Sequence, residues 1–95
     1  MITYEFKNSF DKSVKSISER DKRGIKELCK SFIDVLEKKD VTSKGLGLKR
    51  LKESFWEVRG SLRLRILFRW EGSKVEFILA GNHDQIKRFL KEKNK

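Results

Sequence analysis

The spacing of apolar residues changes twice along the chain. Residues 2–6 alternate between apolar and polar side chains, as a short strand does. Apolar residues then recur every three or four positions, which predicts two helices separated by a polar break at residues 18–22. The first helix is capped by Asn8 or Ser9 and carries Phe10, Val14 and Ile17, and the second carries Ile25, Leu28, Phe32, Val35 and Leu36.

Beyond residues 38–47, which have the composition of a loop, the spacing returns to that of strands. Three strands are predicted at Phe55–Arg59, 62–70 and 75–80, joined by turns that contain glycine. Asn82 and Gln85 have the spacing of a capping box, so a short helix should follow, with a frayed tail at 91–95. The prediction is one α+β domain over residues 1–95. Its antiparallel sheet combines the N-terminal strand with a three-stranded C-terminal meander, two N-terminal helices pack on the sheet, and a short C-terminal helix closes the chain.

The strand at 62–70 separates a basic face from an apolar face. Arg63, Arg65 and Arg69 alternate with Leu64, Ile66, Phe68 and Trp70. By the same parity Trp56 and Trp70 belong to the core. A two-residue turn at 72–73 then pairs Phe68 with Phe77 and Arg65 with Ala80.

A three-residue loop at 60–62 sets Arg59 opposite Arg63 and Glu57 opposite Arg65. The chain beyond residue 80 then runs out beside Arg63. Four side chains are therefore predicted to gather at one end of the polar face, namely Arg59, Arg63, Arg65 and His83. A phosphodiester suits such a group, because close arginines repel one another. The alternative is a solvated outer face on which Glu57 and Glu76 neutralise the arginines.

The charge of the chain is large and uneven. The formal net charge is +10, which favours a polyanionic partner. Residues 1–40 hold ten Lys and Arg against eight Asp and Glu, a net of +2, whereas residues 41–95 hold fourteen against six, a net of +8. The binding surface is expected in the C-terminal half. No apolar run reaches the roughly 18 residues of a membrane span. Cys29 is the only cysteine, and a chain without disulfides suits the cytoplasm.

His83 is the only histidine and lies at the start of the predicted last helix. Imidazole moves protons near neutral pH, and RNA cleavage requires proton transfer at the 2′-hydroxyl and at the leaving oxygen. Taken alone, such a histidine is an ordinary surface residue, and only the arginines make it a candidate. One histidine and one distant cysteine cannot form a closed zinc site, so no metal or other cofactor is expected.

Further basic residues extend the predicted surface. The loop before the second predicted strand holds Lys44, Lys49, Arg50 and Lys52, which are either solvated or in contact with phosphates. Lys87 and Arg88 on the last helix would widen the same surface. Phe89 is either a core residue or stacks on a base.

Three runs of sequence resemble the RelE/ParE superfamily of bacterial toxins from toxin–antitoxin pairs: FWEVR at Phe55–Arg59, RILF at 65–68 and LAGNHD at 79–84. The opening segment, the chain length and the order of elements agree with this resemblance. It implies a compact sheet with helices packed on it, and ribosome-dependent cleavage of messenger RNA without a metal.

The resemblance also assigns roles to single residues. It implies that Arg65 contacts the scissile phosphate, that Arg59 occupies a basic position on the preceding strand, and that His83 matches the catalytic histidine of YafQ-like members. Phe89 falls where RelE has a tyrosine, and Glu57 falls where RelE has a lysine.

These observations together predict a toxin that is an endoribonuclease acting on messenger RNA in the ribosomal A site. Arg59 and Arg65 would stabilise the phosphate with help from Arg63, and His83 would be the general acid or base. The resemblance also implies a protein partner, an acidic antitoxin that covers the basic face or displaces the last helix. Two alternatives stay open: a ParE-like toxin that inhibits DNA gyrase without nuclease activity, and a non-catalytic RNA-binding module.

Overall fold

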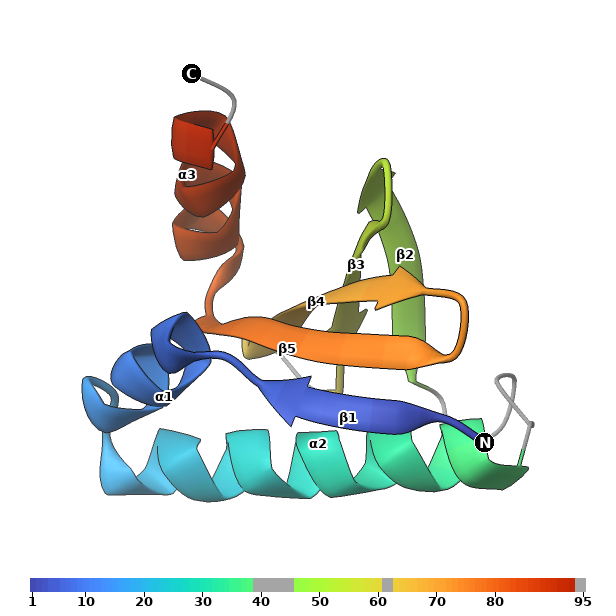
Figure 1. Cartoon of the computed structure of the whole chain (residues 1–95). Coiled ribbons are helices and arrows are strands. Elements are labelled where there is room, and N and C mark those ends of the chain that lie inside the picture. Colours follow the sequence, from blue (N-terminus) through green and yellow to red (C-terminus); the bar gives the residue numbers. More distant parts are fainter. Residues whose placement is uncertain (39–45, 61–62, 94–95) are drawn as a thin grey trace.

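The computed structural model describes residues 1–38, 46–60 and 63–93, and within them the chain is α+β with one five-stranded sheet and three helices (Figure 1). The elements in chain order are β1 (Thr3–Phe6), α1 (Asn8–Lys15), α2 (Glu19–Lys38), β2 (Gly47–Lys52), β3 (Phe55–Arg59), β4 (Arg65–Glu71), β5 (Lys74–Gly81) and α3 (His83–Lys93). The predicted fold class is confirmed. The last helix includes residues 91–93, which were predicted to fray.

The strand order is β1-β5-β4-β3-β2, and the sheet is mixed instead of wholly antiparallel. Strands β2 to β5 pair antiparallel, whereas β1 lies parallel to β5, with Tyr4 opposite Val75 and Phe6 opposite Phe77. Residues directly opposite each other share a face in both kinds of pairing, so alternation alone does not indicate strand direction. The predicted antiparallel arrangement is therefore wrong at β1.

Helix α2 begins at Glu19, inside the predicted polar break at residues 18–22. Ser18 caps it: its Oγ accepts a hydrogen bond from the Asp21 backbone N–H at 3.1 Å, and its carbonyl accepts one from Lys22 at 2.8 Å. The polar residues that indicated a break are the first turn of the helix, where they need no apolar contact.

Strand β2 corrects the predicted loop before the second strand. Residues 39–45 of that loop lie outside the described residues, but Gly47–Lys52 pairs antiparallel with β3. Leu48 packs on the main core while Leu51 packs on the opposite side of the sheet. With apolar residues on both faces, β2 lacks the clean alternation by which a strand is recognised.

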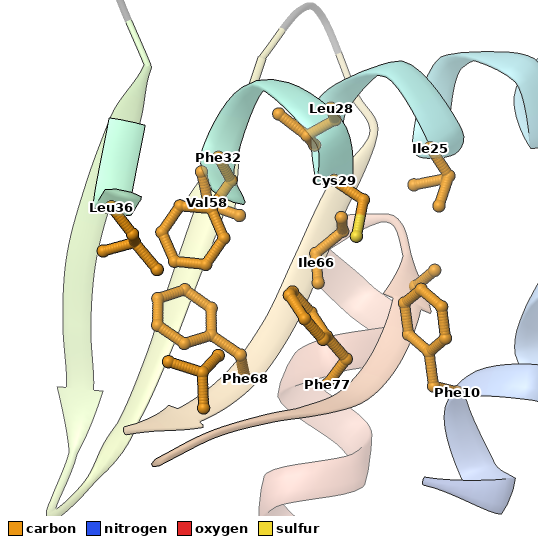
Figure 2. Close-up of a cluster of buried hydrophobic side chains, with 12 residues drawn as sticks. Phe10, Ile25, Leu28, Cys29, Phe32, Leu36, Val58, Ile66, Phe68 and Phe77 are labelled. Carbon is orange, nitrogen blue, oxygen red and sulfur yellow. The ribbon is translucent and has the colours of Figure 1, made fainter. Parts of the chain in front are cut away.

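The core has two parts, one on each side of the sheet. The larger one lies under α1 and α2 and has Phe32, Phe68 and Phe77 at its centre (Figure 2). Trp56 and Trp70 are half-buried and pack against this cluster. The smaller one holds Leu67, Ile78 and Ile86 beneath α3. Helices α2 and α3 therefore lie on opposite sides of the sheet (Figure 1). We call these sides the α2 face and the α3 face.

A β-bulge in β5 changes the predicted register at the end of the strand that leads into α3. Near the turn the pairing is as predicted, with Arg69 opposite Glu76 and Phe68 opposite Phe77. Beyond it the register shifts by one, so that Arg65 lies opposite Gly81 and not opposite Ala80. The extra residue, Ile78, is buried on the α3 face. The bulge thus brings the end of β5, and with it the start of α3, beside Arg65.

Helix α1 holds the bulged end of β5 from the side. Strand β1 ends at Phe6, so it cannot pair with β5 past Phe77. Beyond Phe77, two serine hydroxyls of α1 bond to the β5 backbone instead. Ser9 Oγ donates to the Ile78 carbonyl at 2.5 Å, and Ser13 Oγ accepts from the Ala80 N–H at 2.9 Å. Serine side chains therefore supply hydrogen-bond partners to the backbone of β5 where β1 does not extend far enough to pair with it.

Candidate active site

Arg65 is the centre of the candidate site. Its Nη1 atom lies 2.8 Å from Glu57 Oε2 and 3.3 Å from His83 Nδ1. A guanidinium nitrogen can only donate, so this contact requires the unprotonated form of Nδ1. The two hydrogens of Nη1 are used by Glu57 and His83, and no described group bonds to Nη2. Arg65 thus retains donors for an anionic ligand.

Glu57 holds Arg65 from within the protein. It is 3% exposed, and its Oε1 atom is buried without a hydrogen-bond partner among the described residues, as is Arg65 Nε. A buried carboxylate is tolerated when an opposite charge compensates it. Glu57 therefore fixes the guanidinium at this position. Glu57 was predicted to lie directly opposite Arg65, and that pairing is wrong, because Glu57 lies opposite Leu67 and reaches Arg65 diagonally on the same face. The burial of Glu57 was not predicted.

His83 is placed by the start of α3. The Asn82 side chain accepts a hydrogen bond from the Gln85 N–H at 2.9 Å, and the Gln85 side chain accepts one from the Asn82 N–H at 2.9 Å. This reciprocal pair is the predicted capping box, and it fixes the direction in which α3 leaves β5. His83 is exposed, so its ring is accessible to a ligand that also reaches Arg65.

Arg59 lies directly opposite Arg65 in the β3–β4 pair, and so on the same face. Its side chain runs across Gly47 of β2: a Cβ at Gly47 would lie 3.0 Å from Arg59 Cγ and Nε. The missing side chain at Gly47 leaves room for Arg59 to lie flat over the neighbouring strand. Two guanidinium groups are therefore brought to one end of the α3 face.

Arg63 does not join them, which corrects the predicted cluster. The connection between β3 and β4 is two residues longer than expected, so Arg59 opposes Arg65 and Arg63 lies in the turn. The Arg63 side chain is 75% exposed, and its Nη2 lies 3.6 Å from Asp21 Oδ2 at the start of α2. Because the loop lengthened by an even number of residues, parity kept Arg59 and Arg65 on one face.

The basic residues of β2 divide between the two faces. Lys49 lies opposite Glu57 and shares the α3 face with the site. Arg50 lies opposite Trp56 on the α2 face, and its Nε donates to the Glu53 carbonyl at 2.7 Å. Lys52 is exposed at the end of the hairpin, opposite Phe55. Of these three predicted contacts, only Lys49 is placed beside the candidate site by the sheet.

The predicted residues of α3 also face different directions. Lys87 is exposed and lies one helical turn beyond His83, on the same side of the helix. Arg88 lines a shallow pocket with Ser13 and so faces α1. Phe89 is half-buried against the smaller core cluster. Of these three residues, Lys87 is therefore the one on the same side of α3 as His83.

Among residues 1–38, 46–60 and 63–93, no group of three or more His, Cys, Asp or Glu side chains is arranged to hold a metal ion. No helix in the described part of the chain is both long and apolar enough to cross a membrane.

Sequence comparisons find no relative, because no protein-family model matches the chain and no curated protein matches it. Solved structures do match. A chain of the RelB–RelE antitoxin–toxin complex from Methanococcus jannaschii has a TM-score of 0.66 at 16% identity, over 90% of this chain and 96% of that one.

Two further structures match to a similar degree. A copper-bound mutant toxin from Helicobacter pylori has a TM-score of 0.64 at 16% identity, over 90% of this chain and 99% of that one. YafQ from E. coli has a TM-score of 0.64 at 12% identity, over 90% and 98% of the two chains. The overlap includes nearly all of each chain. The protein therefore has the fold of RelE and the toxins related to it, as the resemblance in its sequence predicts.

Proposed function

We propose that the protein is the toxin of a toxin–antitoxin pair and that it cleaves messenger RNA on the ribosome without a metal. The single observation that carries the nuclease proposal is the Glu57–Arg65–His83 contact, in which a buried acid holds an arginine against an accessible histidine. The fold supports the toxin part, since the Methanococcus jannaschii structure is an antitoxin–toxin complex. The proposed partner is accordingly a cognate antitoxin, and the proposed compartment is the cytoplasm.

In the proposed reaction the 2′-hydroxyl oxygen attacks the adjacent phosphorus, and the bond from phosphorus to the 5′-oxygen breaks. The products are a 2′,3′-cyclic phosphate and a 5′-hydroxyl. Arg59 and Arg65 neutralise the extra negative charge on the phosphate oxygens in the transition state. A bound phosphate competes with His83 for the guanidinium, which frees Nδ1 to accept the 2′-hydroxyl proton, and the departing 5′-oxygen takes a proton from water. Glu57 is a positioning residue, because its carboxylate is buried and acts through Arg65.

The charge distribution supports RNA as the target. Lys49 and Arg59 lie on the same face as an Arg65 whose charge Glu57 compensates, and Lys87 is exposed on α3 one turn beyond His83. Phosphates on either side of the scissile bond would meet these exposed cations. The formal net charge of +10 adds long-range attraction to any polyanion.

The test is to map transcript 5′ ends in a translation reaction to which purified protein is added. We expect His83→Ala and Arg65→Lys each to lower the cleavage rate by about 10²–10⁴-fold, because each removes a group that acts on the transition state. Lysine keeps the charge beside Glu57 but loses the planar fork, so the variant should remain folded.

Arg63→Ala is the matched control, because it removes an arginine that faces Asp21 instead of the site. It should cleave at the rate of the unmodified protein. Full cleavage by His83→Ala would refute the proposed chemistry. Intact transcripts together with broken DNA would instead favour a gyrase target.

A further inference from the structure

A second surface lies on the α2 face, away from the candidate active site. A groove of about 580 Å³ opens between α1, α2 and the end of β1. Its walls are almost wholly apolar and are formed by Phe6, Phe10, Val14, Ile25, Cys29 and Ile33. Phe10, Ile25 and Cys29 are the side chains through which the groove borders the main core (Figure 2).

The groove exposes apolar surface that folding has not covered. Phe6 is 47% exposed, although its ring stacks on Phe77 at a centroid distance of 4.7 Å. Val14 and Ile33 are half-buried on the two helices that form the sides. Burial in this apolar surrounding raises the pKa of the Cys29 thiol to about 11. A concave apolar patch on so small a domain is typical of a surface that binds another protein.

Lysines follow one side of the groove. Lys22, Lys26 and Lys30 are spaced by four residues along α2, so they form a row about 12 Å long. Lys22 pairs with Glu19 at 3.2 Å. In the described part of the chain no carboxylate lies within ion-pair distance of Lys26 or Lys30. Asp34 continues the same row and is the acid among the groove residues.

We propose that this groove binds an amphipathic helix of a partner protein, with its apolar stripe in the groove and acidic residues along Lys26 and Lys30. A helix fits because its two faces match an apolar channel with a charged rim. Nucleic acid does not fit, since it presents phosphates and not an apolar stripe. A second copy of this chain does not fit either, because a two-fold contact would bring the lysine rows of two strongly basic molecules together.

The proposal is independent of the ribonuclease function. The groove and the Arg65 site lie on opposite faces of the sheet, so a helix in the groove leaves the site open. If the partner is the proposed antitoxin, this helix anchors it, and inhibition requires another segment. A peptide that fills only the groove is therefore expected to bind without slowing RNA cleavage.

The probe is a fluorescent peptide of about 18 residues, with leucines at helical spacing and glutamates on the adjoining side. We expect micromolar affinity by anisotropy, and at least tenfold weaker binding to the double variant Lys26→Glu/Lys30→Glu. The control is Lys87→Glu/Lys91→Glu, which makes the same charge change at the same spacing on α3 and should bind like the unmodified protein. In a methyl-labelled sample, resonances of Ile25 and Ile33 should shift while those of Ile78 and Ile86 do not.

Several results would overturn the proposal. These are the absence of binding, equal binding of a peptide with lysines in place of glutamates, and equal weakening by both double variants. Self-association of the protein that Lys26→Glu/Lys30→Glu abolishes would assign the groove to a second copy. A protein that binds the peptide but cuts no RNA would refute the proposed function and leave this inference intact.

Discussion

The ion pair between Glu57 and Arg65 combines a short contact with nearly complete burial of the carboxylate. The two side chains are 4% and 17% exposed, with an N–O distance of 2.8 Å. Arg69 and Glu71 form a pair of the same length, but their side chains are 41% and 59% exposed. The two pairs therefore differ chiefly in their access to water, which sets how much an ion pair contributes.

Glu57→Gln should lower the free energy of unfolding by about 2 kcal/mol, because it leaves the Arg65 charge without its buried partner. Glu71→Gln, at the exposed pair, should change it by less than about 0.5 kcal/mol. Urea denaturation followed by tryptophan fluorescence measures both. Equal effects of the two substitutions would show that burial of Glu57 contributes nothing to holding Arg65.

At the scale of elements, α1 is more than a cover for the core, because its serines complete the hydrogen bonding of β5. Ser13→Ala removes the acceptor of the Ala80 N–H, and Ala80 is 1% exposed. An unsatisfied buried donor costs about 1–3 kcal/mol, so the unfolding free energy should fall by that amount. Hydrogen exchange of the amides at 80–83 should accelerate as well, since the end of β5 is loosened.

Ser16→Ala is the control for this prediction. Its hydroxyl is exposed and donates only to the Ser13 carbonyl, at 2.9 Å. Its loss should change stability by less than about 0.5 kcal/mol. If Ser13→Ala proved as mild as Ser16→Ala, water would be replacing the serine and α1 would not secure the strand end.

The sequence predicted some features of the strands and of the start of α3, and missed others. Face assignments followed from alternation, which is why Arg59 and Arg65 were placed together correctly. The exact partners did not follow, because the bulge at Ile78 and the longer β3–β4 connection depend on tertiary packing that alternation does not record. Strand β2 was missed because both of its faces are partly covered. The capping box was found because its signal lies within four adjacent residues.

Across the whole molecule, the two faces of the sheet differ in character: the α3 face holds the candidate basic site, and the α2 face holds the apolar groove. The uneven charge along the chain pointed to the half that holds the candidate site around Arg65. It did not indicate the groove on the α2 face, whose apolar residues look like ordinary core positions in the sequence. Whether Phe6 or Ile33 is covered depends on how α1 and α2 diverge, and helical spacing does not specify that angle.

If RNA binds the α3 face, the salt dependence of its affinity should change only when a cation on that face is removed. Lys49 and Arg50 are adjacent, exposed and equally charged, but Lys49 shares the face of Arg65 whereas Arg50 points to the α2 face. Each phosphate contact with single-stranded RNA contributes about 0.7 to the slope of log affinity against log salt concentration. Lys49→Ala should reduce the slope by about that amount, and Arg50→Ala should leave it unchanged.

Anisotropy of a short labelled RNA across a salt series measures these slopes, with Arg65→Lys in every protein to slow cleavage during the measurement. The two substitutions remove the same charge one residue apart, so long-range attraction falls equally in both. Any difference in slope therefore reports a local contact. Equal reductions would mean that RNA responds only to total charge, and the α3 face would lose its claim to be the binding surface.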